Sequence, residues 1–403
     1  MNNKNKKVFF CKKCVMSNQK TLPSQPLEDD NQHSNKKKIE FEDGVCFACL
    51  EVEKKYNQNI DWAQREHDLN KFLDKYRSRN GSYDCLVPGS GGKDSVWQAH
   101  ILKTKYNMNP LTVTFSPHIY TEVGMQNFHN WPLKGDVPNF LYTPSGKIHG
   151  KLTSLAFKNL LHPFQPFILG QRHFSSHMAK LFNIKLIFHG ESQAEAGGQK
   201  DELGKPEMLL RYWTRDKKQK IKIAGYDLDE LREFGITEND LKYYLPRDIN
   251  EIKKEEIQLL YLGHWERCEP QENYYLATRL IDFKPNEFRT EQTYSKYNSI
   301  DDRVDAFHYY TAFVKYGYGR CSEEASKEIR NKYITREEGV NLVNKYDSEF
   351  PKRYFQDFLD YTGIKEGEFY ETLNKFRPSH LWVKSGINNS THCADWKLKT
   401  SVR

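Results

Sequence analysis

A glycine-rich stretch, Ser90-Gly91-Gly92-Lys93-Asp94-Ser95, lies between an apolar run at 83–87 and a segment with helical spacing at 95–106. The apolar run predicts a short buried strand, and the spacing after the stretch predicts a helix. Glycine lets a backbone approach an anion closely, and a helix N-terminus presents unpaired N–H groups and a positive dipole end. Strand, turn and helix together predict a phosphate-binding turn in a parallel α/β sheet. An ordinary glycine-rich turn is the alternative.

The side chains of this turn suit a phosphate group. Ser90 and Ser95 offer hydroxyl donors, and Lys93 offers a positive charge. Asp94 could hold a metal ion on the phosphates. The equal alternative is that its carboxylate only stabilises the start of the helix. A Walker A loop is excluded, because it needs four residues between its first glycine and its Gly-Lys-Ser/Thr.

The string Ser-Gly-Gly-Lys-Asp-Ser resembles the PP-loop of the N-type ATP pyrophosphatases. That resemblance implies that ATP is bound, that it is cleaved between the α and β phosphates, and that an AMP ester forms on a substrate oxygen. It implies catalytic roles for Lys93 and Asp94. Nucleotide contacts are expected from the whole loop, namely Ser90, Gly91, Gly92, Lys93, Asp94 and Ser95. Mg²⁺ is expected to help hold the pyrophosphate.

Short apolar runs alternate with longer amphipathic segments from residue 83 to residue 189. Strands are predicted at 83–87, 111–115, 139–143 and 184–189, and helices at 56–80, 95–106, 151–161 and 171–182. This alternation predicts a Rossmann-like parallel sheet with helices on both faces. After about residue 270 the strand pattern fades, and helices are predicted at 299–316, 323–332, 337–345 and 353–361.

Two Cys-x-x-Cys pairs, Cys11 with Cys14 and Cys46 with Cys49, lie near the N-terminus. Each two-residue gap lets both thiolates of a pair turn toward one ion, so the pairs predict a structural, zinc-ribbon-like four-cysteine Zn²⁺ site. The intervening segment is longer than in most zinc ribbons and polar, which predicts an inserted loop. Redox-active or unrelated cysteines are the alternative. The scattered remaining cysteines are expected to be small core or surface residues, namely Cys85, Cys268, Cys321 and Cys393.

These patterns divide the chain into a cysteine module at 1–55, a PP-loop domain at 56–270 and a mainly helical substrate region at 271–403. An aromatic share of 14% favours a folded enzyme over a disordered chain. The charge of +7 is a modest excess, and its lysine runs predict solvated surface, with an anionic partner as the weaker alternative. No apolar run is long enough for a membrane span or a secretory signal, so a cytoplasmic protein is expected.

Several segments resemble the N-acetyl sugar amidotransferase family. Two of them are His189-Gly190-Glu191-Ser-Gln-Ala-Glu195 and Tyr294-Ser-Lys296-Tyr-Asn-Ser-Ile-Asp301-Asp302-Arg303. The others span 111–121, 161–171, 328–330, 334–339 and 349–354. The likeness covers nearly the whole chain, and the polar insert between the cysteine pairs is a departure from the family pattern. Members of this family act on acidic sugars such as pseudaminic and legionaminic acids, or on acetamido sugars of O-antigens.

The resemblance implies a reaction on an acetamido sugar in the biosynthesis of bacterial surface or flagellin glycans. Amide resonance makes the N-acetyl carbon a poor electrophile. Adenylation of the amide oxygen would give an imidate with AMP as leaving group, and addition of ammonia would then give an acetamidino sugar. The site must therefore stabilise phosphate charge, exclude water and guide ammonia.

The source of ammonia is expected to be a separate glutaminase subunit, or free ammonium in vitro. Residue 2 is Asn, which is incompatible with a glutaminase that uses an N-terminal cysteine. No cysteine lies in a Gly-x-Cys-x-Gly nucleophile elbow, so a fused glutaminase of that class is not expected.

Further site residues follow from strand ends and from the family-like segments. Glu191 follows a predicted strand at its ligand-binding end, and we expect it to position Mg²⁺ or ammonia, with a surface carboxylate as the alternative. Lys296 is a catalytic candidate, and Arg303 could neutralise pyrophosphate or a sugar carboxylate, with a helix-start salt bridge to Asp301 or Asp302 as the alternative. Gly190, Thr114 and Arg303 complete the expected nucleotide contacts. Weaker candidates are His118, Tyr120 and Glu195.

Two other classes compete with the sugar amidotransferase. A tRNA thiolase also combines a PP-loop with zinc cysteines, but it normally needs a nucleophilic cysteine near the ATP site. No Cys-x-x-Cys occurs after residue 49, and the basic excess is too small to require nucleic acid. A zinc-bearing scaffold that binds nucleotide without turnover is the non-enzymatic alternative.

Overall fold

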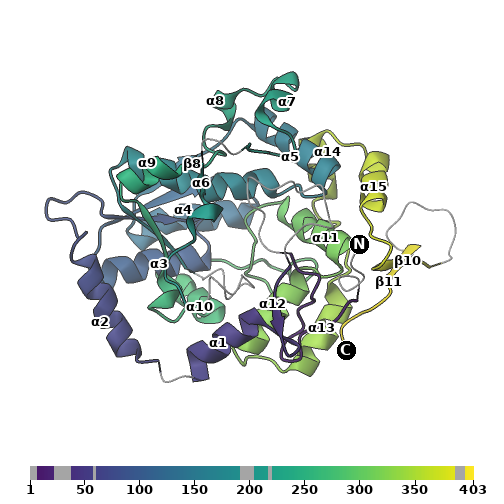
Figure 1. Ribbon diagram of the computed structural model, residues 1–403, viewed down its shortest axis with the longest axis horizontal. Coiled ribbons are helices and arrows are strands. Elements are labelled where there is room, and N and C mark those ends of the chain that lie inside the picture. The colour runs from purple at the N-terminus through teal and green to yellow at the C-terminus, as the bar shows by residue number, and fades with distance from the viewer. Residues whose placement is uncertain (1–6, 22–37, 58–59, 191–203, 217–219, 386–394) are drawn as a thin grey trace.

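A five-stranded parallel sheet lies in the part of the protein shown on the left of Figure 1. The computed structural model describes residues 7–21, 38–57, 60–190, 204–216, 220–385 and 395–403. The strands run in the order β5-β4-β3-β6-β9, and each pairing is parallel. They span β3 (Cys85–Pro88), β4 (Pro110–Phe115), β5 (Asn139–Tyr142), β6 (Leu186–His189) and β9 (Gln258–Tyr261). The predicted parallel sheet is confirmed, and β9 is an additional strand.

Alternate residues of the strands face two different hydrophobic clusters. On β3, Cys85 and Val87 belong to the cluster that contains Trp97, whereas Leu86 belongs to the cluster that contains Phe174. Successive side chains of a strand point to opposite faces, so both faces of this sheet are buried. Strands buried on both sides carry continuous apolar runs, which is the pattern that made them visible in the sequence.

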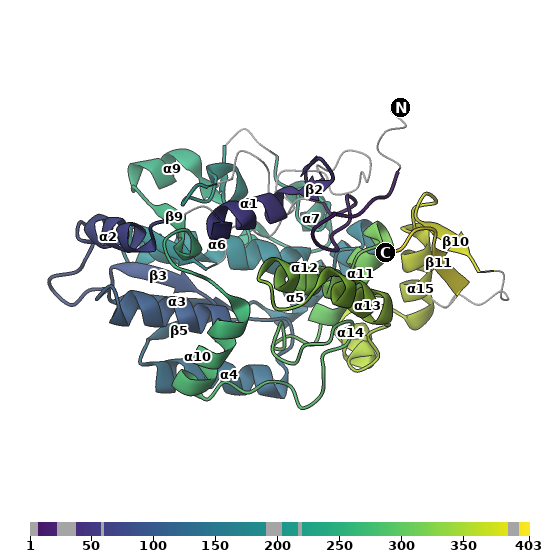
Figure 2. The same cartoon turned by 90° about the horizontal axis from the view of Figure 1, so that it is seen from below.

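Helices cover both faces of the sheet, and Figure 2 shows them on its two sides. One face carries α2 (Trp62–Leu73), α3 (Lys93–Thr104), α4 (Glu122–Gly135) and α10 (Pro270–Ile281). The other carries α5 (Gly146–Leu160) and α6 (Gln165–Leu181). Because α10 packs on α3 and α4, residues 270–281 lie with the sheet and not with the helices that follow.

Smaller elements connect β6 to α10. They are η3 (Leu210–Tyr212), β7 (Thr214–Arg215), α7 (Leu228–Glu233), α8 (Glu238–Leu241), β8 (Arg247–Asp248), α9 (Ile249–Lys254) and η4 (Leu262–His264).

The C-terminal region is mainly helical, as predicted, and ends in a β-hairpin. It contains α11 (Asp305–Tyr316), α12 (Arg320–Arg330), α13 (Arg336–Tyr346), α14 (Phe355–Thr362), α15 (Glu366–Lys375), β10 (Trp382–Lys384) and β11 (Trp396–Leu398). It packs on the sheet domain through aromatic rings, for example Phe157 of α5 stacked on Phe369 of α15 at 5.0 Å. The helix predicted at 299–316 begins only at Asp305, because the backbone before it pairs with the segment after β4, where Arg303 N–H donates to the Ile119 carbonyl (2.9 Å).

The cysteine module packs against the C-terminal helices rather than against the sheet. It contains the hairpin β1 (Phe41–Glu42) and β2 (Val45–Cys46), followed by α1 (Phe47–Asn57). Its cysteines share a hydrophobic cluster with Tyr318, and the Arg336 guanidinium of α13 donates to the carbonyls of Cys11 (3.4 Å) and Cys14 (3.3 Å). Among the described helices, none combines the length and the apolar character needed to cross a bilayer.

Candidate active site

The glycine-rich loop leaves β3 and turns tightly into α3. Gly91 has φ +78°, and a Cβ there would lie 2.9 Å from the Phe128 Cα, so only glycine fits without strain. A Cβ on Gly89 would lie 2.2 Å from the Ser95 Cβ. The Ser95 hydroxyl donates to the Gly92 carbonyl (2.9 Å), and this bond closes the turn from within. The loop is thus a fixed backbone cradle at the N-terminus of α3, a geometry suited to an anion.

The loop lies where the strand order reverses. β4 and β5 lie on one side of β3, and β6 and β9 lie on the other. In open α/β sheets, ligands bind outside the carboxyl ends of the strands at such a point. The cavity found there has a volume of about 330 Å³ and is lined by residues 90–94 of the loop. We refer to it as the loop cavity.

Two further sides of the loop cavity come from other parts of the chain. Facing the loop is the helical wall, which consists of residues 299–301 and of Asp305, His308 and Tyr309 of α11. A third side is apolar and comes from the start of α6 and from the segment after α10. Its members include Phe164, Phe167, Ile168, Phe283 and Tyr297. The loop cavity thus has charged groups on two sides and aromatic surface on a third, as ligand pockets commonly do.

Lys93 and Asp94 are held against each other at the start of α3. The Lys93 ammonium lies 2.7 Å from one Asp94 carboxylate oxygen, and the Asn273 amide donates to the other (2.9 Å). Burial alone would raise the pKa of Asp94, but the charge of Lys93 and the bond from Asn273 hold that pKa below its usual value. The Asp94 side chain is 47% exposed and lines the loop cavity. It therefore presents an ionised carboxylate to the cavity.

Asp301 brings a second carboxyl group to the loop from a distant part of the sequence. Its side chain hydrogen-bonds with Ser90, and burial, with the nearby charge of Asp302, raises the pKa of Asp301. Its carbonyl accepts from Thr121 N–H (3.0 Å). Gly124 allows this approach, since a Cβ there would lie 2.4 Å from the Asp301 Cα. Asp94 and Asp301 therefore lie beside the same loop, which is a carboxylate pair that suits Mg²⁺ on phosphates.

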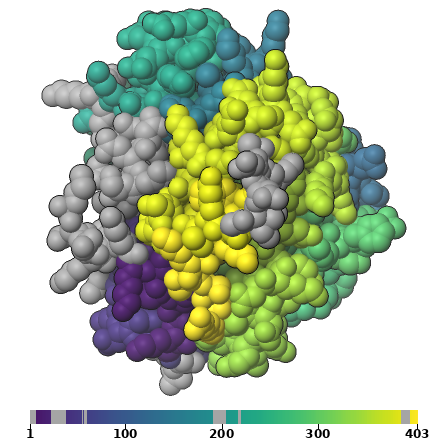
Figure 3. All heavy atoms as spheres, turned by 90° about the vertical axis from the view of Figure 1, so that its right-hand side faces the viewer, coloured from purple at the N-terminus to yellow at the C-terminus, as the bar shows by residue number. Residues whose placement is uncertain are grey.

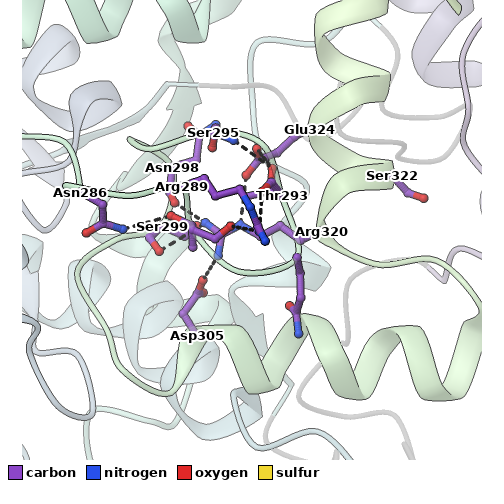
Figure 4. A network of polar contacts seen from close by, with 12 residues as sticks. Asn286, Arg289, Thr293, Ser295, Asn298, Ser299, Asp305, Arg320, Ser322 and Glu324 are labelled. Carbon is purple, nitrogen blue, oxygen red and sulfur yellow. Dashed lines mark hydrogen bonds and ion pairs between the residues drawn. The ribbon is translucent and has the colours of Figure 1, made fainter. Parts of the chain in front are cut away.

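A buried arginine holds the helical wall in place (Figure 4). Arg320 of α12 is 1% exposed, and its guanidinium lies 2.9 Å from the Asp305 carboxylate and 3.1 Å from that of Glu324. It also donates to the carbonyls of Asn298 and Ser299. Arg320 therefore fixes the backbone before Asp301 and the Asp305 side chain at once. No local pattern around Arg320 in the sequence predicts this role.

His308 presents a neutral imidazole to the loop cavity. Burial lowers the pKa of His308 to about 4, and its Nδ1 is buried without a hydrogen-bond partner in the described part of the chain. Its ring stacks on His162 and on Phe164, each at 5.1 Å. His118, in contrast, lies behind the wall, with its Nδ1 2.6 Å from the Asp302 carboxylate. Its part in the structure is to fix the 302–304 turn.

The structure places several predicted site residues away from the loop cavity. Lys296 is exposed, and its ammonium donates to the Glu287 carbonyl (2.8 Å). Arg303 pairs with Asp357 of α14, which is a different partner from those considered in the sequence. Thr114 lies below the loop, where its hydroxyl donates to the Gly89 carbonyl (2.7 Å). It therefore supports the loop from underneath.

Gly190 lies at the carboxyl end of β6, next to α3. A Cβ there would lie 2.8 Å from the Gln98 amide nitrogen, so glycine lets β6 end close to the helix that follows the loop. Glu191 and Glu195 lie outside the described residues.

The four N-terminal cysteines converge as predicted. All are buried, and their sulfur atoms lie within 4.8 Å of one another. Cys11 Sγ is 3.9 Å from Cys49 Sγ, and Cys14 Sγ is 3.7 Å from Cys46 Sγ. These separations suit four thiolates around one tetrahedral ion with Zn–S bonds of about 2.3 Å. The donor set therefore fits a structural zinc ion.

One further thiol lies near the loop. Asn273, which donates to Asp94, also places its amide nitrogen 3.5 Å from Cys268 Sγ. Cys268 is buried and is not part of the cavity lining. Cys85 and Cys321 are also buried, so the described cysteines offer no second thiol pair beyond the zinc-type cluster.

Residues 291–401 match the family model described as "LPS biosynthesis protein WbpG-like, C-terminal domain". The matched residues include the helical wall. The chain is also 32% identical over 86 residues to "Uncharacterized protein MJ1599" of Methanocaldococcus jannaschii, over 21% of this chain and 30% of that relative. Among solved structures, NMN synthetase from Francisella tularensis aligns with 55% of this chain and 94% of its own, at 12% identity and a TM-score of 0.26.

Proposed function

We propose that this protein is an ATP-dependent amidotransferase of glycan biosynthesis, which converts the acetamido group of a sugar into an acetamidino group. One observation carries the proposal. The phosphate-binding loop and the wall from the domain matched to LPS biosynthesis enclose a single cavity. A nucleotide held by the loop would therefore face residues of a glycan-biosynthesis domain, which is the arrangement that adenylation of a sugar requires.

The reaction proceeds in two steps whose atoms balance. The amide oxygen of the sugar attacks the α-phosphorus of ATP, the bond to pyrophosphate breaks, and an O-adenylyl imidate forms. Ammonia adds to the imidate carbon, and AMP leaves with the former amide oxygen. The products are the acetamidino sugar, AMP and pyrophosphate. Activation is needed because an amide carbon accepts ammonia poorly until its oxygen is part of a good leaving group.

The loop supplies the charge stabilisation for the first step. Residues 90–94, including Lys93, line the cavity. Their backbone N–H groups and the Lys93 ammonium would stabilise the negative charge that develops on pyrophosphate as the bond breaks. Asp94 and Asp301 would hold Mg²⁺, which neutralises phosphate oxygens when bound. The Ser90 bond to Asp301 keeps that carboxyl beside the loop before nucleotide arrives.

The aromatic side of the loop cavity has two roles: it packs against the sugar, and it protects the reactive imidate from water. Phe164, Phe167 and Tyr297 present ring surface on which a sugar can pack. The same rings exclude water, which would otherwise hydrolyse the imidate. His308 adds a neutral nitrogen that can hydrogen-bond the acetamido group without introducing a charge.

The test is a turnover assay with the purified chain, MgATP, ammonium chloride and a panel of acetamido sugars, both free and nucleotide-linked. We expect AMP and pyrophosphate to form over many turnovers only when a sugar and ammonium are both present. The sugar product should be lighter by about one mass unit, because an oxygen is replaced by an NH group. AMP formation without any mass change in every sugar would overturn the proposal.

A tRNA thiolase remains the second candidate, and Cys268 is the observation that favours it. A sulfur-transfer enzyme would need this thiol, whereas the amidotransferase does not use it. Cys268→Ala should therefore leave the formation of acetamidino sugar within about twofold of the parent protein, since the substitution removes only a small buried group. Thiolation of bulk tRNA by the parent chain, abolished in Cys268→Ala, would establish the second candidate instead.

We also propose that ammonia comes from a separate glutaminase subunit in the cell. The described cysteines are the zinc-type cluster and three buried thiols outside the cavity lining, so none is placed as a glutaminase nucleophile. Glutamine should therefore not replace ammonium in the assay with the isolated chain. Turnover with glutamine and no second protein would contradict this.

A further inference from the structure

A second, larger cavity lies within the C-terminal region. It has a volume of about 700 Å³ and lies between α11, α13 and the terminal hairpin. α11 separates it from the loop cavity, because His308 and Tyr309 line the loop cavity whereas Tyr310 and Phe313 line the second one. Figure 3 shows the face of the molecule where the C-terminal residues, in yellow, meet the N-terminal segment, in purple.

Acidic groups line this cavity, but each is already engaged by the protein. Glu349 is held by the Arg289 guanidinium through two bonds of 2.6 and 2.7 Å. Asp347 accepts from the N–H groups of Gly319 (2.9 Å) and Ser322 (3.0 Å) and from the Ser322 hydroxyl. Glu291 accepts from the backbone N–H groups of residues 352 and 353. Arg289 therefore compensates the charge of Glu349, whereas Asp347 and Glu291 are held in place by neutral N–H and hydroxyl donors.

The basic groups of the same lining are not compensated in this way. Arg377, Lys352 and Lys397 line the cavity, and none of them forms an ion pair with any other residue that the structure describes. Arg377 instead lies between two indole rings, 4.5 Å from Trp382 and 5.5 Å from Trp396. A guanidinium stacked on aromatic rings keeps its planar N–H donors free for a carboxylate or phosphate.

The aromatic lining indicates what kind of anion fits. Tyr310, Phe313, Phe350, Trp382 and Trp396 give the cavity an apolar surface beside its free cations. Pockets of this volume accommodate ligands of drug-like size, and the faces of a sugar ring pack well on aromatic side chains. Inorganic anions would use the cations and leave the aromatic surface unused. A sugar that carries a negative group would use both.

We propose that the second cavity is a binding site for an anionic sugar, with its carboxylate or phosphate on Arg377 and its ring against Trp396. The site is distinct from the loop cavity and does not depend on the proposed amidotransferase reaction. Lys352 and Lys397 add positive charge at its rim. The carboxylate of an acidic sugar and the phosphate of a sugar phosphate present the same chemistry to Arg377, and binding measurements with each distinguish the two.

The experiment is isothermal titration of the full-length protein with N-acetylneuraminate, N-acetylglucosamine 1-phosphate and neutral N-acetylglucosamine. At least one anionic sugar should bind, and the neutral sugar should bind at least about tenfold more weakly, because a charged hydrogen bond is lost. Binding of the carboxylate sugar alone identifies an acidic sugar as ligand, and binding of the phosphate alone identifies a sugar phosphate. Equal affinity for the neutral sugar, or no binding of either anion, would overturn the proposal.

Three variants assign the binding to this cavity. Arg377→Ala should weaken the binding of the anionic sugar by roughly 10-fold to 100-fold. Lys375→Ala removes an exposed charge at the last residue of α15, two residues before Arg377, and should have no effect. Lys93→Ala alters only the loop cavity, so it should bind the sugar as the parent does. Loss of binding in Lys93→Ala but not in Arg377→Ala would place the sugar in the loop cavity and contradict the proposal.

Discussion

The two charged walls of the loop cavity are built in different ways. The loop wall is one continuous stretch, 90–94, whose shape is set by glycines and by the start of α3. The helical wall is assembled from residues 299–309 and is held by Arg320, which comes from the next helix. The loop wall carries the groups that we propose bind phosphate, whereas the helical wall depends on a buried charge network. Substitutions should therefore affect chemistry on one side and folding on the other.

The largest effect is expected from Arg320→Met. It leaves Asp305 and Glu324 as buried carboxylates without their partner, and breaking a buried ion pair costs about 3–5 kcal/mol of unfolding free energy. Urea unfolding followed by circular dichroism measures this loss. The triple variant Arg320→Met/Asp305→Asn/Glu324→Gln should recover part of the loss, since it removes the uncompensated charges. If the triple variant is no more stable than the single one, the network does not hold the wall in the way described.

Lys93→Ala tests the loop wall. In the proposed reaction the Lys93 ammonium stabilises the phosphates, so its removal from a preorganised site should lower kcat/KM for AMP formation by about 100-fold or more. The unfolding free energy should change little, in contrast to Arg320→Met. Lys103→Ala is the matched control, because Lys103 lies on the same helix and, among the described residues, forms an ion pair only with exposed Asp136. Activity near that of the parent in Lys93→Ala would show that the loop does not hold the reacting phosphates.

The difference between the walls also explains which parts of the fold and of the candidate site could be predicted from the sequence. The loop wall, the sheet and the four-cysteine cluster are local patterns of glycine spacing, apolar runs and Cys-x-x-Cys pairs, and they were predictable. The helical wall is not local. Asp301 reaches Ser90 across about two hundred residues, and Arg320 acts through partners in a loop and two helices. No single-chain periodicity encodes such tertiary pairings.

The same reason applies to Lys296 and Arg303. Both lie in a family-like segment next to the residues that line the cavity, yet their side chains contact Glu287 and Asp357 instead. A segment can be identified from its sequence, but the direction of each side chain depends on backbone that pairs elsewhere. Here the 299–304 turn pairs with the segment after β4, and α11 therefore begins later than the sequence pattern predicts.

His308 should make the helical wall sensitive to acid. Its pKa is lowered from 6.5 to about 4 by burial, so between these values the unfolded chain binds a proton that the folded chain does not. Stability is therefore fully present above pH 6.5 and falls as pH decreases toward 4, by at most about 1.4 kcal/mol per pH unit from this residue.

Unfolding titrations of the parent protein and of His308→Asn, from pH 8 to pH 4, measure the pH-dependent stability that His308 contributes. Above pH 6.5 the unfolding free energies of the two proteins should change with pH in parallel. Below pH 6.5 the variant should lose less unfolding free energy than the parent. Other buried histidines contribute to both proteins equally, since burial also lowers the pKa of His173 to about 3 and of His189 to about 4. Identical slopes in the two proteins would show that His308 is not held neutral by the wall.

Asp301→Asn addresses the point where the two walls meet, and its effect should be the smallest. The amide can still hydrogen-bond Ser90, so the loop keeps its position, but one anionic ligand for Mg²⁺ is lost. The concentration of Mg²⁺ needed for half-maximal AMP formation should rise roughly tenfold, with little change in kcat at saturating Mg²⁺. Asp282→Asn is the matched control, because it makes the same change at the exposed C-terminal end of α10. A fall in kcat that excess Mg²⁺ does not restore would mean that Asp301 acts on the sugar rather than on Mg²⁺.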